Sequence, residues 1–299
     1  MALRRLLAPL DGSSLAESIL PAVRRLGEAC GAAVTLMHIR EEHAPATIHG
    51  QPHLADAAQA ESYLARVADP LREAGIKVEC HVHETLEGDV ARSIVQHADE
   101  FRPDLVALCT HGHGGVRDIL FGSIAQQVLQ RGHWPVLVVE PSADGTATGF
   151  DPRRILVALD GAEEHGAPLD LAAGMACALG ARLDLAMVVP TRETLAGDRS
   201  APRRTMPATM TAILELAERN AVAYLQQAAR TCSQAGADVH ASVLRGEPVD
   251  EIMRLASETR ADLLVLSSHG KVGLDALVSG SFGARIIARG RTPLVLVKS

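Results

Sequence analysis

Short runs of apolar residues alternate with longer segments of mixed polarity along the whole chain. The short runs are rich in Val, Leu and Ile, whereas apolar residues in the longer segments recur at helical spacing. An apolar run without alternation is typical of a strand that is buried on both faces, as in a parallel sheet covered by helices. We therefore expect strands at residues 6–10, 33–38, 78–82, 105–109 and 136–139, and again at 155–159, 183–187, 239–243, 263–266 and 294–297.

The second half of the chain repeats the first. Asp11 and Asp160 each follow the first strand of their half and lie 149 positions apart, whereas Pro135 and Pro293 lie 158 positions apart. The two offsets differ by nine residues, which places a net insertion in the second copy, within residues 191–211. The chain therefore contains two homologous copies of one domain.

Each copy has the size and the order of elements of one α/β domain. We expect two tandem Rossmann-like domains, each a five-stranded parallel sheet with helices on both faces. The expected ranges are 1–140 for the first domain, 141–152 for a small, polar, glycine-containing linker and 153–299 for the second domain. Such sheets bind ligands beyond the carboxyl ends of their strands, so we expect Asp11, His38 and residues 109–112 to converge on one cleft.

Composition narrows the class of protein. Apolar residues make up 47% of the chain, and no segment approaches the roughly 20 apolar residues of a membrane span. The net charge is −7 and aromatic residues make up 2%, so the basic footprint and stacking platforms of a nucleic-acid surface are missing. Five cysteines without CxxC spacing fit a reducing compartment. We expect a soluble cytoplasmic protein with neither a nucleic-acid nor a membrane partner.

A glycine motif follows the fourth predicted strand of each copy. The first copy has CTHG at 109–112, nine residues, and GS at 122–123, and the second has SSHG at 267–270, nine residues, and GS at 280–281. Glycines let a backbone approach a ligand closely. A Gly-Ser pair at the start of a helix offers N–H groups, a hydroxyl and the positive end of the helix dipole, which suit a phosphate.

The order of these features resembles that of the universal stress protein family. Asp11-Gly12-Ser13 after the first strand, His38 after the second, the glycine motif and a closing strand at 135–139 follow one another, and the second copy repeats most of this order. The chain looks like a tandem member over nearly its whole length. The resemblance implies the strand order 3-2-1-4-5 in each domain. It also implies binding of ATP, alone or with Mg²⁺, by a G-x-x-G, nine-residue, G-[S/T] motif.

The resemblance further implies which residues bind the nucleotide. Asp11 and Asp160 are expected beside the adenine and ribose, and the backbone of Ile39 or Val188 at the adenine edge. Pro9 is expected to line the adenine pocket of the first domain. The phosphates are expected on the residues of the two glycine motifs, namely Gly112, Gly122, Ser123, Ile124, Gly270, Gly280, Ser281 and Phe282.

The two copies depart from the family motif in different degrees. Its first glycine is replaced by Cys109 in the first copy and by Ser267 in the second. The counterpart of Pro9 is Ala158. We therefore expect the first domain to bind nucleotide better than the second.

Some of these residues also have a purely structural interpretation. Asp11 and Asp160 can simply cap the helix that follows, which Asp does well.

A zinc site is a further hypothesis for the first copy. His81 and His83 alternate on a predicted strand, and the other histidines of that region are His43, His49 and His53. Because the second copy does not share these histidines, we expect no metal there.

Three function classes remain open from the sequence. The first is an adenine-nucleotide-binding regulatory module of the stress response, in which ATP sets the conformation or assembly state. The second is a slow ATPase or self-phosphorylating protein with Ser123 or Ser281 as acceptor, but neither motif shows a general base and no P-loop lysine is present. The third is a stress-response interaction protein without nucleotide. We assign no catalytic residue.

The closing strands bear on assembly. In the family, the final strand is commonly a sheet edge that pairs across a dimer axis. The resemblance therefore implies that residues 136–139 and 294–297 pair within one chain to form a pseudo-dimer of the two domains. We also expect two chains to associate as a homodimer, since exposed sheet edges demand a partner.

Overall fold

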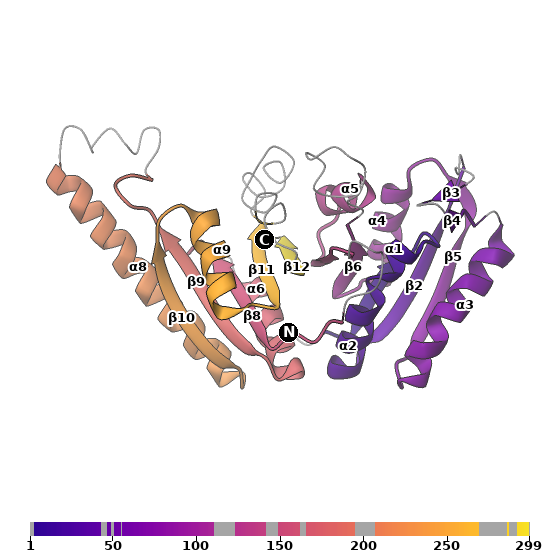
Figure 1. Ribbon diagram of the computed structural model, residues 1–299, viewed down its shortest axis with the longest axis horizontal. Coiled ribbons are helices and arrows are strands. Elements are labelled where there is room, and N and C mark those ends of the chain that lie inside the picture. The colour runs from indigo at the N-terminus through magenta and orange to yellow at the C-terminus, as the bar shows by residue number, and fades with distance from the viewer. Residues whose placement is uncertain are drawn as a thin grey trace. The chain divides into compact units, whose positions relative to one another are not determined.

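The computed structural model divides the chain into two compact units (Figure 1). Ala2–Asp151 and Arg291–Lys298 form the first unit, and Pro152–Gly290 forms the second. The helices within the described residues are all too short or too polar to cross a membrane. The structure describes residues 3–42, 47–48, 51–54, 56–110, 123–141, 149–161, 166–194, 207–268, 286 and 292–298.

The first unit is built on a parallel sheet whose strands lie in the order β5-β2-β1-β6-β7. In chain order this is 3-2-1-4-5, which confirms the expected strand order for this domain. A short antiparallel pair, β3 and β4, follows β2. The strands are β1 (Arg5–Pro9), β2 (Ala33–Glu41), β3 (Thr47–Ile48), β4 (Gln51–Pro52), β5 (Val78–Glu87), β6 (Leu105–Cys109) and β7 (Val136–Val139).

Helices cover both faces of this sheet. Successive side chains of a strand point to opposite faces, and Leu6, Leu7 and Ala8 of β1 are all at most 1% exposed. The unbroken apolar run of β1 therefore reflects burial on both sides. The helices of the first unit are α1 (Ser14–Glu17), α2 (Leu20–Cys30), α3 (Ala57–Glu73), α4 (Val90–Phe101) and α5 (Ser123–Arg131).

The second unit repeats the architecture. Its parallel strands lie in the order β10-β9-β8-β11. They are β8 (Arg154–Leu159), β9 (Arg182–Val189), β10 (Asp238–Arg245) and β11 (Leu263–Ser268). The helices are α6 (Gly166–Leu179), α8 (Pro207–Gln234) and α9 (Pro248–Thr259). With 28 residues, α8 is longer than the 17-residue α3 of the first unit, so part of the inserted sequence extends this helix.

The last strand, β12 (Leu294–Lys298), belongs to the first unit. It pairs with β7 in antiparallel orientation, with Leu294 opposite Val138 and Leu296 opposite Val136. The expected pairing of the two closing strands within one chain is therefore confirmed. The pairing also covers the edge of β7, which would otherwise present unpaired N–H and C=O groups.

Candidate functional site

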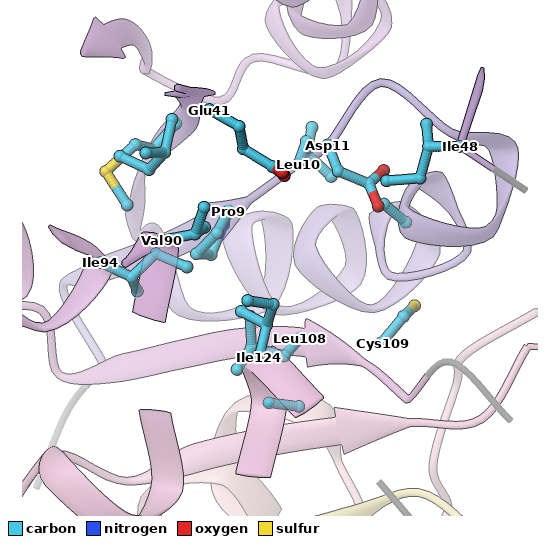
Figure 2. A pocket seen from close by; sticks show the side chains of 14 residues that line it. Pro9, Leu10, Asp11, Glu41, Ile48, Val90, Ile94, Leu108, Cys109 and Ile124 are labelled. Carbon is cyan, nitrogen blue, oxygen red and sulfur yellow. The ribbon is translucent and has the colours of Figure 1, made fainter. Parts of the chain in front are cut away.

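A cavity of about 260 Å³ lies at the carboxyl ends of β1, β2 and β6 in the first unit (Figure 2). The chain leaves β1 for β2 on one side and later returns to β6 on the other, so this is the switch point of the sheet. The cavity is lined by Pro9, Leu10, Asp11, Ala16, Met37, Ile39, Glu41, Ile48, Val90, Ile94, Leu108, Cys109, Ile124 and Ala125.

Four of the predicted site residues meet in this cavity. Pro9 and Asp11 come from the end of β1, Ile39 from β2 and Ile124 from the start of α5. Cys109, at the position of the first motif glycine, lines it as well. The predicted residues that lie outside the described part of the chain are Gly112, Gly122, Gly270, Gly280, Ser281 and Phe282, together with the side chain of Ser123.

The two predicted residues of the second unit that the structure describes also lie at strand ends. Asp160 follows β8 and is exposed, and Val188 is half-buried near the end of the neighbouring strand β9. Burial raises the pKa of the Tyr224 hydroxyl on α8, and the charge of Asp160 adds to this shift. The structure thus places a tyrosine of α8 within electrostatic reach of Asp160.

The sequence did not single out several residues of the cavity. Val90 and Ile94 lie one turn apart on α4 and make this helix part of the cavity wall, and Glu41 adds a second carboxylate to the lining. The available signal was the helical spacing of Val90 and Ile94. That spacing cannot tell a position that faces a cavity from one that faces the packed core.

Asp11 is held in place by the turn that follows it. Its Oδ1 accepts hydrogen bonds from the backbone N–H of Ser13 at 2.8 Å and from the Ser13 hydroxyl at 2.6 Å. The residue that caps α1 is Ser13, whose Oγ accepts from the N–H of Ala16 at 3.1 Å. The structural alternative for Asp11 is therefore wrong in detail, because Asp11 orients the cap and is not the cap itself.

Gly12 lets the chain make this turn. Its φ is +92°, and a Cβ on it would lie 2.9 Å from the Cγ of Leu54. We expect Gly12→Ala to lower the free energy of unfolding by about 1–3 kcal/mol, because it adds a clash to backbone strain. The matched control is Gly31→Ala, with φ +64° and no atom within 4 Å of the new Cβ. Urea unfolding should show the smaller loss for Gly31→Ala, whereas equal losses would mean that Leu54 moves aside.

The cavity has apolar walls and a polar rim. Pro9, Ile39 and Leu108 supply aliphatic surface, and Asp11 and Glu41 supply carboxylates. Ile124 and Ala125, the second and third residues of α5, also line the cavity. The first N–H groups of α5, which have no partner within the helix, and its positive dipole end are therefore adjacent to the cavity, and this environment suits an anion.

The side chain of Cys109 is an uncharged part of the cavity lining. Its side chain is buried, and burial, with a smaller contribution from the charge of Asp11, raises the pKa of its thiol to about 12. Only the thiolate is a nucleophile, so Cys109 is unreactive at neutral pH. It contributes bulk where the family motif has a glycine.

His38 fixes the backbone next to Asp11. Its Nδ1–H donates to the carbonyl oxygen of Leu10 at 2.8 Å, and the ring is buried. Burial is the main cause that lowers its pKa, and the nearby His53 lowers it further. The Leu10 bond and the charges of Asp11 and Glu41 act in the opposite direction. The imidazole is therefore held neutral in the folded chain.

This burial predicts a pH dependence of stability. In the unfolded chain His38 takes up a proton near pH 6.5, the ordinary pKa of histidine, whereas in the folded chain its pKa is lower. The free energy of unfolding should therefore fall as the pH drops below 6.5. We expect His38→Met, which copies Met187 of the second unit, to lose less stability than the wild type over this range. Urea unfolding at several pH values measures the free energy of unfolding of both proteins. If this free energy fell equally with pH in His38→Met and in the wild type, His38 would not be the source of the pH dependence.

The fold and the switch-point cavity define an α/β protein made of two Rossmann-like domains in tandem. Comparison with known proteins agrees, because the model of the universal stress protein family matches residues 2–140 and again residues 152–298. The chain belongs to the universal stress protein family.

Individual relatives support this membership. Universal stress protein MJ0531 of Methanocaldococcus jannaschii is 31% identical over 86 residues, which are 29% of this chain and about half (51%) of that relative. Stress response protein NhaX of Bacillus subtilis is 23% identical over 161 residues, 46% of this chain and 97% of that relative. A universal stress protein structure from Archaeoglobus fulgidus matches 98% of both chains with a TM-score of 0.69 and 21% identity, and it supports the tandem fold.

Proposed function

We propose that the first domain binds an adenine nucleotide, with ATP as the principal ligand, in the cavity at the ends of β1, β2 and β6. The chain would then act as a nucleotide-binding module of the stress response, in which the bound nucleotide sets its conformation or assembly. One observation carries the proposal. Pro9, Asp11, Ile39 and Ile124 come from three distant parts of the sequence and line one cavity.

The chemistry of the cavity fits the nucleoside part of such a ligand. The aliphatic side chains of Pro9, Ile39 and Leu108 can pack against the flat faces of an adenine. The two bonds from Ser13 orient the Asp11 carboxylate, and ribose hydroxyls would donate hydrogen bonds to carboxylate oxygens at this position.

The phosphates are expected to leave the cavity at the start of α5. A volume of about 260 Å³ is near the lower end of small-molecule sites, so it suits the nucleoside better than a whole triphosphate. The N–H groups at the start of α5 favour an anion there. Asp11 and Glu41 would repel the phosphates, and a Mg²⁺ ion bound to the nucleotide would offset this repulsion.

The experiment is to denature the purified full chain without added ligand and to identify any released nucleotide by chromatography and mass spectrometry. We expect about one equivalent of an adenine nucleotide per chain. The nucleotide-free protein should then show a higher melting temperature with ATP, because ATP binds the folded state alone. GTP is the matched control for the base. Absence of released nucleotide together with no response to ATP would refute the proposal.

A further inference from the structure

Three histidines gather where β5 meets α4 in the first unit. His81 and His83 are two residues apart on β5 and therefore project from the same face of the strand, while His97 lies on α4. One ring nitrogen of each histidine lies within 4.8 Å of the other two. The His97 ring centroid is 4.7 Å from those of both His81 and His83. His97 is 8% exposed, so the cluster is shielded from water on the side of the helix.

The hydrogen bonds around two of these rings place one proton on each ring. His97 Nδ1 is 2.9 Å from the carbonyl oxygen of Ser93, which can only accept, so Nδ1 carries the proton. His83 Nε2 is 2.8 Å from Oε1 of Glu87, a carboxylate, so Nε2 carries the proton there. In the neutral rings, His97 Nε2 and His83 Nδ1 are therefore the atoms that carry lone pairs.

These two lone-pair atoms face one another. His83 Nδ1 and His97 Nε2 are 3.2 Å apart. Two lone pairs at this distance repel unless a proton or a metal ion lies between them. Two histidine ligands of a tetrahedral zinc ion, each about 2.0–2.1 Å from the metal, have nitrogens about 3.3–3.4 Å apart. The observed separation is close to that of two zinc ligands.

We propose that His81, His83 and His97 bind one Zn²⁺ ion. His81 reaches the ligand distance if its ring moves by at most about 1.5 Å, which rotation about its broad terminal torsion allows. Glu87 and the Ser93 carbonyl hold the two other rings from behind, in the arrangement that orients histidine ligands and raises their basicity. Three neutral imidazoles and a fourth position for water suit zinc.

The proposed ion would fasten the outer strand β5 to α4. Phe101, one turn after His97, closes the apolar side, with its ring 5.2 Å from that of His81. The cluster shares no residue with the cavity, so it is a separate site.

The second unit provides an internal comparison. Val78 pairs with Val34 in the first unit, and Val239 pairs with Leu183, the counterpart of Val34, in the second. This register puts Ser242 and Leu244 at the positions of His81 and His83. Helices α4 and α9 each contain 12 residues, and their alignment puts Leu255 at the position of His97. The ligand set belongs to the first unit alone.

Of the other histidines considered in the sequence, the structure describes His53, which has different neighbours. The Nδ1 of His53 is 3.1 Å from the carbonyl oxygen of Leu54, and its Nε2 is 3.8 Å from Oε1 of Glu41. His43 and His49 lie outside the described residues. The sequence-based expectation of no metal rested on the absence of these histidines from the second copy, and it did not consider His97.

Zinc titration of the chelator-treated, full-length protein tests the proposal, with calorimetry and elemental analysis after desalting. We expect one equivalent of Zn²⁺ per chain and a higher melting temperature with zinc. The double variant His83→Ala, His97→Ala should lose the bound equivalent. His133→Ala and His240→Ala remove exposed histidines outside the cluster and should keep it. Co²⁺ in place of Zn²⁺ should give the intense visible bands of a tetrahedral site.

A milder variant guards against misfolding of the double variant. Glu87→Gln removes a partly exposed carboxylate and should weaken zinc binding by about 10–100-fold while the stoichiometry stays at one. Failure of the wild type to bind zinc, or equal binding by the double variant, would overturn the proposal. A third contrary result would come from nitrogen NMR at neutral pH. If the spectra showed one proton shared by His83 and His97, and zinc left these spectra unchanged, the proposal would be wrong.

Discussion

Asp11→Asn is expected to weaken ATP binding by about 10–100-fold. Asn keeps an oxygen that can accept the bonds from Ser13, so the turn into α1 should survive. The substitution removes the negatively charged carboxylate that would accept hydrogen bonds from the ribose hydroxyls. A hydrogen bond to a charged group contributes about 1.5–3 kcal/mol, and each 1.4 kcal/mol is roughly tenfold in affinity. Titration calorimetry of the nucleotide-free protein measures the change.

Asp160→Asn is the matched control for this variant, because Asp160 follows β8 as Asp11 follows β1. Our proposal puts the principal site in the first domain, so Asp160→Asn should bind ATP nearly as the wild type does. The reverse result, a loss for Asp160→Asn and none for Asp11→Asn, would move the principal site to the second domain.

The second large effect concerns the sheet that carries the cavity. Leu7→Ala is expected to lower the free energy of unfolding of the first unit by about 2–5 kcal/mol. Leu7 is 0% exposed and lies on β1, between Thr35 of β2 and Val106 of β6. The smaller side chain leaves a cavity that strands paired on both sides cannot close.

Leu86→Ala on β5 is the control for Leu7→Ala. Leu86 is 52% exposed, so its truncation should change stability by no more than about 0.5 kcal/mol. Urea unfolding followed by circular dichroism compares the two variants. Similar losses would contradict the burial on which the account of this sheet rests.

Much of the fold could be predicted because the central strands are unbroken apolar runs. The ends of β2 and β5 were harder to predict. These strands continue to Glu41 and Glu87 through an irregularity in their pairing after Ile39, and the added residues include polar ones. Backbone pairing extends β2 and β5 to these residues, and the sequence has no apolar pattern that would predict the extension.

The candidate site was predictable to the extent that its residues follow strands. Pro9 and Asp11 follow the central strand of a parallel sheet, where ligands bind. Val90 and His97 lie on the same helix, and only the packing of that helix brings one to the cavity and the other to the histidine cluster. Likewise, the sequence offered Asp11 as the cap of α1, and the structure gives this role to Ser13, whose backbone is extended and whose side chain accepts from Ala16.

Photo-crosslinking of the full chain with 8-azido-ATP tests the central claim most directly. The azide sits on the adenine, so the crosslinked peptide identified by mass spectrometry reports where the base lies. We predict labelling of peptides that contain Pro9, Ile39 or Ile124, and loss of the label when excess ATP competes. Labelling confined to residues after 152, or labelling that ATP does not reduce, would contradict an adenine-nucleotide site in the first domain.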